Sequence, residues 1–151
     1  MSKTARRRSR ELALQGLYEW LVAGSAVNDI ARDLSLSQSY PKSDQPYVDE
    51  ILRGVVATRA ELEASLVPLL DRPVDQLSPI EHAVLLIAAW ELVYQPALPF
   101  RVVTNEAIEL VKSYGGTDGH KFVNGVLDKL AGAGRARGAD AAPPPADADP
   151  E

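Results

Sequence analysis

A dense group of arginines near the amino terminus is the part of the sequence best suited to binding a polyanion. Arg6, Arg7, Arg8 and Arg10 lie within five residues of one another. On a helix, residues three and four apart share a face, so Arg6, Arg7 and Arg10 are expected to present three guanidiniums together. A guanidinium offers a planar fork of donors that matches a phosphate and stacks on a base. The group predicts RNA binding, although short basic runs without such a role also occur.

Charge is distributed unevenly along the chain. The 151 residues have a formal net charge of -5. The first ten residues hold five of the 16 basic residues and none of the 21 acidic ones, so the remainder has a charge of -10. Because an acidic body repels nucleic acid, a bound polyanion must be held locally at the basic end. Like charges this dense repel one another, so we expect the basic segment to be frayed until a polyanion binds.

A second candidate site begins at Asp118, where the last helix is expected to start. The free N–H groups of a helix amino terminus favour anions. Lys121 adds positive charge, and Phe122 offers a face on which an unpaired base can stack. The local sequence by itself favours simpler roles, with Asp118 as a helix cap and Phe122 in the core.

Two further positions are candidates for contact with a protein partner. Leu14, Tyr18 and Val22 form a second apolar stripe on the first helix, which is either a wide core face or a surface for a partner. Glu81 belongs to a capping box that begins at Ser78, a sufficient reason for its presence. Its carboxylate could also face a partner.

Patterns typical of catalysis or metal binding are missing from the sequence. There is no cysteine, and His82 and His120 are the only histidines. Neither histidine can be paired with a serine and an acid from the sequence, and Glu81 beside His82 lacks the HExxH spacing of a zinc site. We therefore expect no enzyme, no metal and no cofactor. A hydrolase that uses surface carboxylates is the weaker alternative.

The elements that position these residues are expected to be helices. Alanine and leucine recur through the chain, and both are strong helix formers. Apolar residues at steps of three and four predict helices over residues 4–23, 27–34, 45–57, 59–70, 79–94, 101–114 and 118–131. Residues 35–46 are expected to form a loop. The helix over 79–94 is apolar on nearly every face, which predicts burial by neighbours on all sides.

The composition changes at residue 132. From there to residue 151 the chain contains only Gly, Ala, Arg, Asp, Pro and Glu. We expect one helical domain over residues 1–131 and a disordered acidic tail over residues 132–151. The longest apolar stretch, residues 83–90, is too short to span a membrane, and the lack of cysteine suits a reducing cytoplasm.

Two parts of the sequence resemble the NusB family of transcription antitermination proteins. Residues 5–18, ARRRSRELALQGLY, resemble the arginine-rich start of that family. Residues 105–114, NEAIELVKSY, and 120–128, HKFVNGVLD, resemble its carboxy-terminal signature. The resemblance covers about residues 3–130 and leaves the tail outside.

The resemblance implies an all-α fold of seven helices in two packed bundles. It implies binding of a single-stranded boxA RNA together with the ribosomal protein NusE, and assembly on RNA polymerase with other Nus factors during ribosomal RNA transcription. The residues implied for RNA are Arg6, Arg7, Arg10, Asp118, Lys121 and Phe122, and those implied for NusE are Tyr18 and Glu81. The resemblance leaves open whether the chain is a homodimer. A protein-interaction module that touches RNA only incidentally is the alternative.

Overall fold

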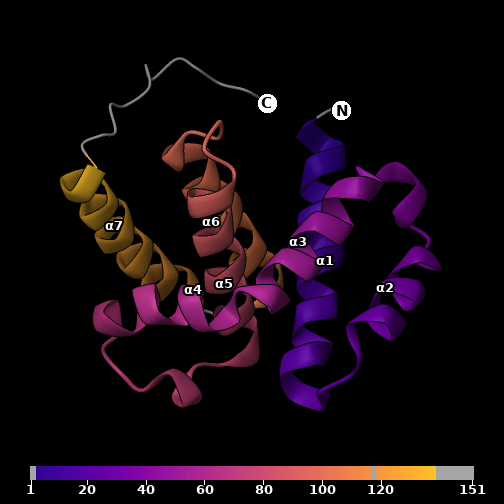
Figure 1. Ribbon diagram of the computed structural model, residues 1–151, viewed down its shortest axis with the longest axis horizontal. Coiled ribbons are helices and arrows are strands. Elements are labelled where there is room, and N and C mark those ends of the chain that lie inside the picture. The colour runs from indigo at the N-terminus through magenta and orange to yellow at the C-terminus, as the bar shows by residue number, and fades with distance from the viewer. Residues whose placement is uncertain (1–2, 117, 139–151) are drawn as a thin grey trace.

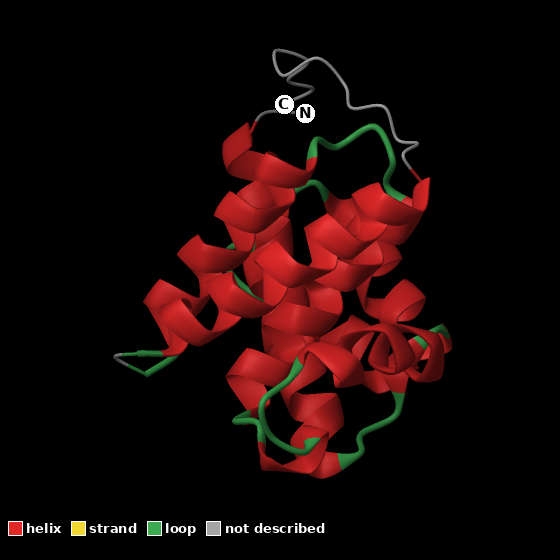
Figure 2. Cartoon of the chain, turned by 90° about the vertical axis from the view of Figure 1, so that its left-hand side faces the viewer, coloured by secondary structure: helices red, strands yellow, loops and turns green. Residues whose placement is uncertain are grey.

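Helices account for the regular structure of the residues that the computed structural model describes, which are 3–116 and 118–138 (Figure 2). No strand occurs among them. The α-helices are α1 Lys3–Ala23, α2 Val27–Ser35, α3 Gln45–Ala57, α4 Arg59–Leu66, α5 Pro79–Tyr94, α6 Phe100–Tyr114 and α7 Gly119–Gly138. Short 3-10 helices cover Tyr40–Lys42 (η1), Val67–Leu69 (η2) and Val74–Gln76 (η3). The predicted all-α fold with seven helices is confirmed.

The helices form two groups that meet along α1 and α5 (Figure 1). Helix α1 packs on α2 and α3 within the first group, and on α5 and α6 of the second. Helix α5 contacts α1, α3, α4, α6 and α7, and its residues from His82 to Glu91 are all buried. The prediction that this helix is buried on all sides is confirmed. No described helix is both long and apolar enough to span a membrane.

Local signals in the sequence fix several helix ends. The Ser78 hydroxyl accepts a hydrogen bond from the Glu81 backbone N–H at 3.1 Å, which confirms the predicted cap of α5. Gly24 follows the end of α1 with a φ of 70°, in the left-handed region that glycine adopts without strain. Helix α4 ends at Leu66, earlier than predicted, and continues as η2, where Pro68 has no backbone N–H to donate.

The carboxy-terminal boundary differs from the prediction. Helix α7 continues to Gly138, seven residues beyond the expected end at Ala131. The predicted end of this last helix is therefore too early, since residues 132–138 are helical. The rest of the predicted tail, residues 139–151, lies outside the described part of the chain.

A glycine on α3 sets how closely the two groups approach. A Cβ added at Gly54 would overlap atoms of the Trp90 indole on α5, including Nε1 and Cε2. Trp90 is buried, and its ring also contacts Tyr47 and Tyr94. Because the indole is rigid and surrounded, it has little room to move. The close approach therefore requires glycine inside a helix, where alanine is otherwise preferred by about 1 kcal/mol.

We predict that Gly54→Ala destabilises the protein by about 1–3 kcal/mol, because the new methyl group overpacks the contact with Trp90. The matched control is Gly125→Ala on α7, where an added Cβ meets no atom within 4 Å. That substitution should leave stability unchanged or raise it by up to about 1 kcal/mol. Urea unfolding followed by circular dichroism measures both. Equal effects of the two substitutions would contradict the role given to Gly54.

Candidate nucleic-acid interface

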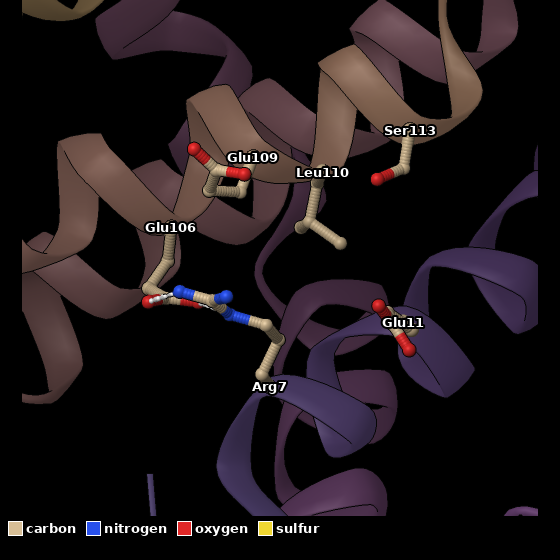
Figure 3. A pocket seen from close by; sticks show the side chains of 6 residues that line it. All are labelled: Arg7, Glu11, Glu106, Glu109, Leu110 and Ser113. Carbon is tan, nitrogen blue, oxygen red and sulfur yellow. Dashed lines mark hydrogen bonds and ion pairs between the residues drawn. The ribbon is translucent and has the colours of Figure 1, made fainter. Parts of the chain in front are cut away.

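The arginines at the start of α1 turn toward different helices. The Arg6 Nε donates to Asp44 Oδ2 at 3.2 Å, and its guanidinium lies 3.9 Å from the centre of the Tyr47 ring. The Arg7 Nε and Nη2 donate to the two carboxylate oxygens of Glu106 on α6, at 3.0 and 2.8 Å (Figure 3). The exposed fractions of the two side chains are 30% for Arg6 and 43% for Arg7. Both therefore keep part of the guanidinium open to a ligand.

These ion pairs also change what was expected of the basic segment. Helix α1 begins at Lys3, and carboxylates from other parts of the chain offset the charges of Arg6 and Arg7. The prediction that mutual repulsion leaves this segment frayed until a polyanion binds is therefore wrong.

Arg10 does not share an exposed face with Arg6 and Arg7. Its side chain is 1% exposed, and its Nε donates to Glu91 Oε2 at 2.8 Å. Its Nη1 lies 3.6 Å from Glu106 Oε1. The prediction of three guanidiniums on one open face is wrong for Arg10, because α1 is covered by α5 and α6 on that side. In this position Arg10 holds helices together.

Four side chains from four helices form one buried cluster: Arg10, Tyr47, Glu91 and Glu106. The Tyr47 hydroxyl donates to Glu91 Oε2, the oxygen that also accepts from Arg10. Burial raises the pKa of Tyr47 well above its usual value, and the charge of Glu91 raises it further. Glu106 bridges Arg10 of the cluster to Arg7 at the surface. The cluster thereby fixes α1 against α3, α5 and α6.

Sequence reasoning missed Glu91 and Glu106 as partners of the arginines. Glu91 lies in the most apolar helix of the chain and is 1% exposed. A buried carboxylate needs a buried cationic or donor partner, so its position was a usable signal. Glu106 lies in the carboxy-terminal signature, but the sequence does not indicate which cation it meets.

A hollow between α1 and α6 surrounds Arg7 with carboxylates (Figure 3). Glu11, Glu106 and Glu109 line it, together with Leu110 and Ser113. The hydrogen bond to Glu106 is the main cause that raises the pKa of Arg7, and burial opposes it. A phosphate that binds Arg7 must compete with these groups, so this end of the surface is less cationic than its sequence suggests.

A second hollow farther along α1 contains Tyr18. It has a volume of about 390 Å³ and is lined by Leu14, Gln15, Tyr18, Ile80 and Tyr114. Tyr18 is 41% exposed and Val22 is exposed, whereas Leu14 is buried. The second apolar stripe therefore divides, with Leu14 in the core and the other two residues at the surface.

Glu81 connects this hollow to the start of α7. It follows Ile80 in sequence, and its Oε2 lies 3.0 Å from the position of a Cβ built on Gly119. Asp118, just before α7, is exposed, and its carbonyl accepts from the N–H groups of Lys121 and Phe122 at 3.2 and 3.5 Å. Glu81, one of the two positions predicted to face a partner, thus lies beside the second predicted RNA site.

Lys121 and Phe122 lie on the first turn of α7. Lys121 is exposed, and Phe122 is partly buried against the core. The guanidinium of Arg72 lies 4.3 Å from the centre of the Phe122 ring. Arg7 and Tyr18 line the two hollows beside α1, and Arg6 lies on the α3 side of that helix. Lys121 and Phe122 line a separate hollow, with Leu69 and Asp71. Among the described residues, no group of three or more His, Asp or Glu is placed to hold a metal ion.

Comparison with known proteins gives one family. The model of the NusB family matches residues 7–132. A transcription antitermination protein NusB from Paraburkholderia phymatum is 57% identical over 129 residues, which cover 85% of this chain and 89% of that protein. One from Burkholderia mallei is 55% identical over 131 residues, covering 87% and 90%.

Solved structures of NusB proteins share the fold. NusB of T. maritima superimposes with a TM-score of 0.77 at 28% identity, covering 87% of this chain and 93% of that one. A structure described as antitermination factors NusB and NusE in complex with dsRNA gives a TM-score of 0.80 at 23% identity, covering 87% and 99%.

The buried cluster predicts a loss of stability at high pH. Below the ordinary tyrosine pKa of 10.0, Tyr47 is protonated in both the folded and the unfolded chain. Above it, the unfolded chain loses this proton while the folded chain keeps it, so the free energy of unfolding falls as pH rises. Tyr47→Phe should make that fall shallower by about 1.4 kcal/mol per pH unit. Urea unfolding at a series of alkaline pH values measures the slope, and an unchanged slope would contradict a buried, protonated Tyr47.

Proposed function

We propose a function from the premise that this chain belongs to the NusB family of transcription antitermination proteins. It binds a boxA-type single-stranded RNA together with the ribosomal protein NusE, and joins RNA polymerase with other Nus factors while ribosomal RNA is transcribed. The family match over residues 7–132 supports the proposal, since it includes Arg7 on α1 and the start of α7.

The observation that carries RNA binding is the partly exposed pair of arginines on an otherwise acidic chain. Arg6 and Arg7 each keep part of the side chain open while a carboxylate fixes the rest. A fixed guanidinium loses less conformational entropy when it binds a phosphate than a freely moving one does. The rest of the chain carries a charge of -10, so nucleic acid should bind at these arginines and not over the whole surface.

The proposed roles follow the position of each side chain. Arg6 and Arg7 bind phosphates, Lys121 binds a further phosphate, and Phe122 stacks on an unpaired base. Asp118 lies beside the bound RNA strand, at the start of α7. Arg10 is buried, so its role in this proposal is to position α1 and not to touch RNA.

The proposed NusE surface is the hollow that contains Tyr18, with Glu81 at its edge. Exposed tyrosines beside an apolar hollow are common in protein interfaces, because one end of the ring is apolar and the other forms hydrogen bonds. Tyr18 and Tyr114 are both 41% exposed there. A NusB protein with the same fold is described in a complex with NusE and dsRNA, which supports NusE as the partner to test. This hollow also keeps the alternative of a protein-interaction module open.

The double substitution Arg6→Ala, Arg7→Ala should weaken binding of labelled boxA-type single-stranded RNA without unfolding the protein. The slope of log affinity against log salt should shrink by roughly 0.7 for each arginine that neutralises a phosphate. Fluorescence anisotropy over a range of salt concentrations measures both quantities. The matched control is Arg32→Ala on α2, an exposed arginine paired with Asp29. Unchanged affinity of the double variant would overturn the proposed function.

Tyr18→Ala should leave the affinity for RNA alone unchanged and remove the increase in affinity that NusE provides. Its matched control is Tyr94→Ala, at the end of α5, because Tyr94 is exposed to a similar extent, at 40%. The same RNA titration, with and without NusE, measures the effect. Weaker binding to RNA alone would place Tyr18 in the RNA site and contradict its assignment to NusE.

A further inference from the structure

A groove lies beside Phe122 and extends along the first three turns of α7. Its apolar floor is made by Leu69, Phe122 and Val126, and its rim carries Asp71, Lys121 and Lys129. The groove runs between α7 and the segment that follows η2, and its volume is about 190 Å³. An apolar floor with two lysines on the rim suits a flat ring attached to a phosphate.

Glycine keeps this groove open. Lys121, Gly125 and Lys129 lie four residues apart on α7, so they form one stripe along the helix. A Cβ built on Gly125 meets no atom within 4 Å, so nothing in the fold requires glycine there. Apart from proline, glycine is the least favourable residue in the interior of a helix. Its presence between two lysines leaves a gap into which a ligand can fit.

Arg72 adds a third cation and a stacking surface. Its guanidinium covers the Phe122 ring at 4.3 Å and pairs with Asp71 at 2.7 Å. Both members of that ion pair are well exposed, at 41% and 66% of the side chain. Exposed pairs of this kind contribute little to stability, so a phosphate can take the place of Asp71. A guanidinium that lies over an aromatic ring can also stack on a base.

We propose that this groove binds one further nucleotide of the single-stranded RNA, next to the one at Phe122, with its base against Gly125, Val126 and Arg72 and its phosphate on Lys129 and Arg72. This extends the RNA track along α7, and it rests on the proposed function. Asp71 competes with the RNA phosphate for Arg72. The open strand is the ligand because a base must leave its stack to reach the floor of the groove.

The first test removes the cations. The double substitution Arg72→Ala, Lys129→Ala should weaken binding of the labelled boxA-type RNA, and the slope of log affinity against log salt should shrink by roughly 0.7, because the two cations share one phosphate. Arg32→Ala on α2 is the control for loss of an exposed, ion-paired arginine, and α2 and α7 lie at opposite sides of the molecule (Figure 1). An equal effect of the control would show that charge alone matters and would overturn the groove.

The second test fills the groove without changing charge. Gly125→Leu should lower RNA affinity about fivefold or more, the effect of losing one stacked base, and leave the salt slope unchanged. Leucine favours the helix, so folding is not impaired. The control is Gly132→Leu, another α7 position where an added Cβ meets no atom within 4 Å and which does not line the groove. Asp71→Asn should do the opposite and tighten binding, because it removes the competitor for Arg72.

The outcomes separate this inference from the proposed function. Variants of Arg72, Lys129 and Gly125 that bind RNA like the unaltered protein, with Arg6→Ala, Arg7→Ala impaired, would overturn the groove alone. Unchanged binding by all of these variants would overturn both. Weaker RNA binding by the cation and glycine variants, with tighter binding by Asp71→Asn, supports the groove. If Arg72 had only a structural role, removing its partner Asp71 would not raise the affinity for RNA.

Discussion

The ion pair between Arg10 and Glu91 is the interaction on which the position of the basic end depends. Both side chains are 1% exposed, so each has lost nearly all of its contact with water. Removing one member of such a pair typically costs about 3–5 kcal/mol, because the other charge remains buried. Tyr47 and Glu106 supply further hydrogen bonds and charge from α3 and α6. Since the pair forms only when α1 and α5 are in one register, it fixes α1 along the junction of the two groups.

That register decides which arginines reach a ligand. With Arg10 turned inward, Arg7 lies over α6 and Arg6 over α3. Three arginines within five residues therefore have three environments, one buried and two half-open on opposite flanks of the helix. Glu106 joins the interior to the surface because its carboxylate meets both Arg10 and Arg7. If a phosphate replaces Glu106 at Arg7, the Glu106 carboxylate still lies near Arg10. It therefore keeps a cationic partner and does not become an unpaired buried charge.

The sequence predicts the helices well because their signals are local. Apolar spacing places α3 and α5 at their observed bounds, and the cap at Ser78 needs only the next three residues. Periodicity also places Arg7 and Arg10 on one side of α1, but it does not tell which helix covers that side. Arg10 pairs with Glu91 on α5, which lies 81 residues away in sequence, so local periodicity cannot identify the covering helix.

The same limit applies at the other end of the candidate surface. Lys121 and Phe122 could be predicted as neighbours on one helical turn. Arg72 lies 50 residues before Phe122 in the chain, and only the packing of the segment after η2 against α7 brings the two together. Local patterns thus predict the cations on each helix, and the fold adds the partners that orient them.

Under the proposed function, the carboxylates along this surface favour a single strand over a duplex. Glu11, Glu109 and Asp71 lie beside the cations and oppose any polyanion in proportion to its charge density. Duplex DNA carries about one charge per 1.7 Å of its axis, and each separate strand carries about half of that. A flexible strand can place its phosphates at Arg7, Lys121 and Lys129 and keep them away from the acids between, whereas a rigid duplex has fixed spacing. Acids interleaved with a few oriented cations therefore weaken duplex binding more than they weaken single-strand binding.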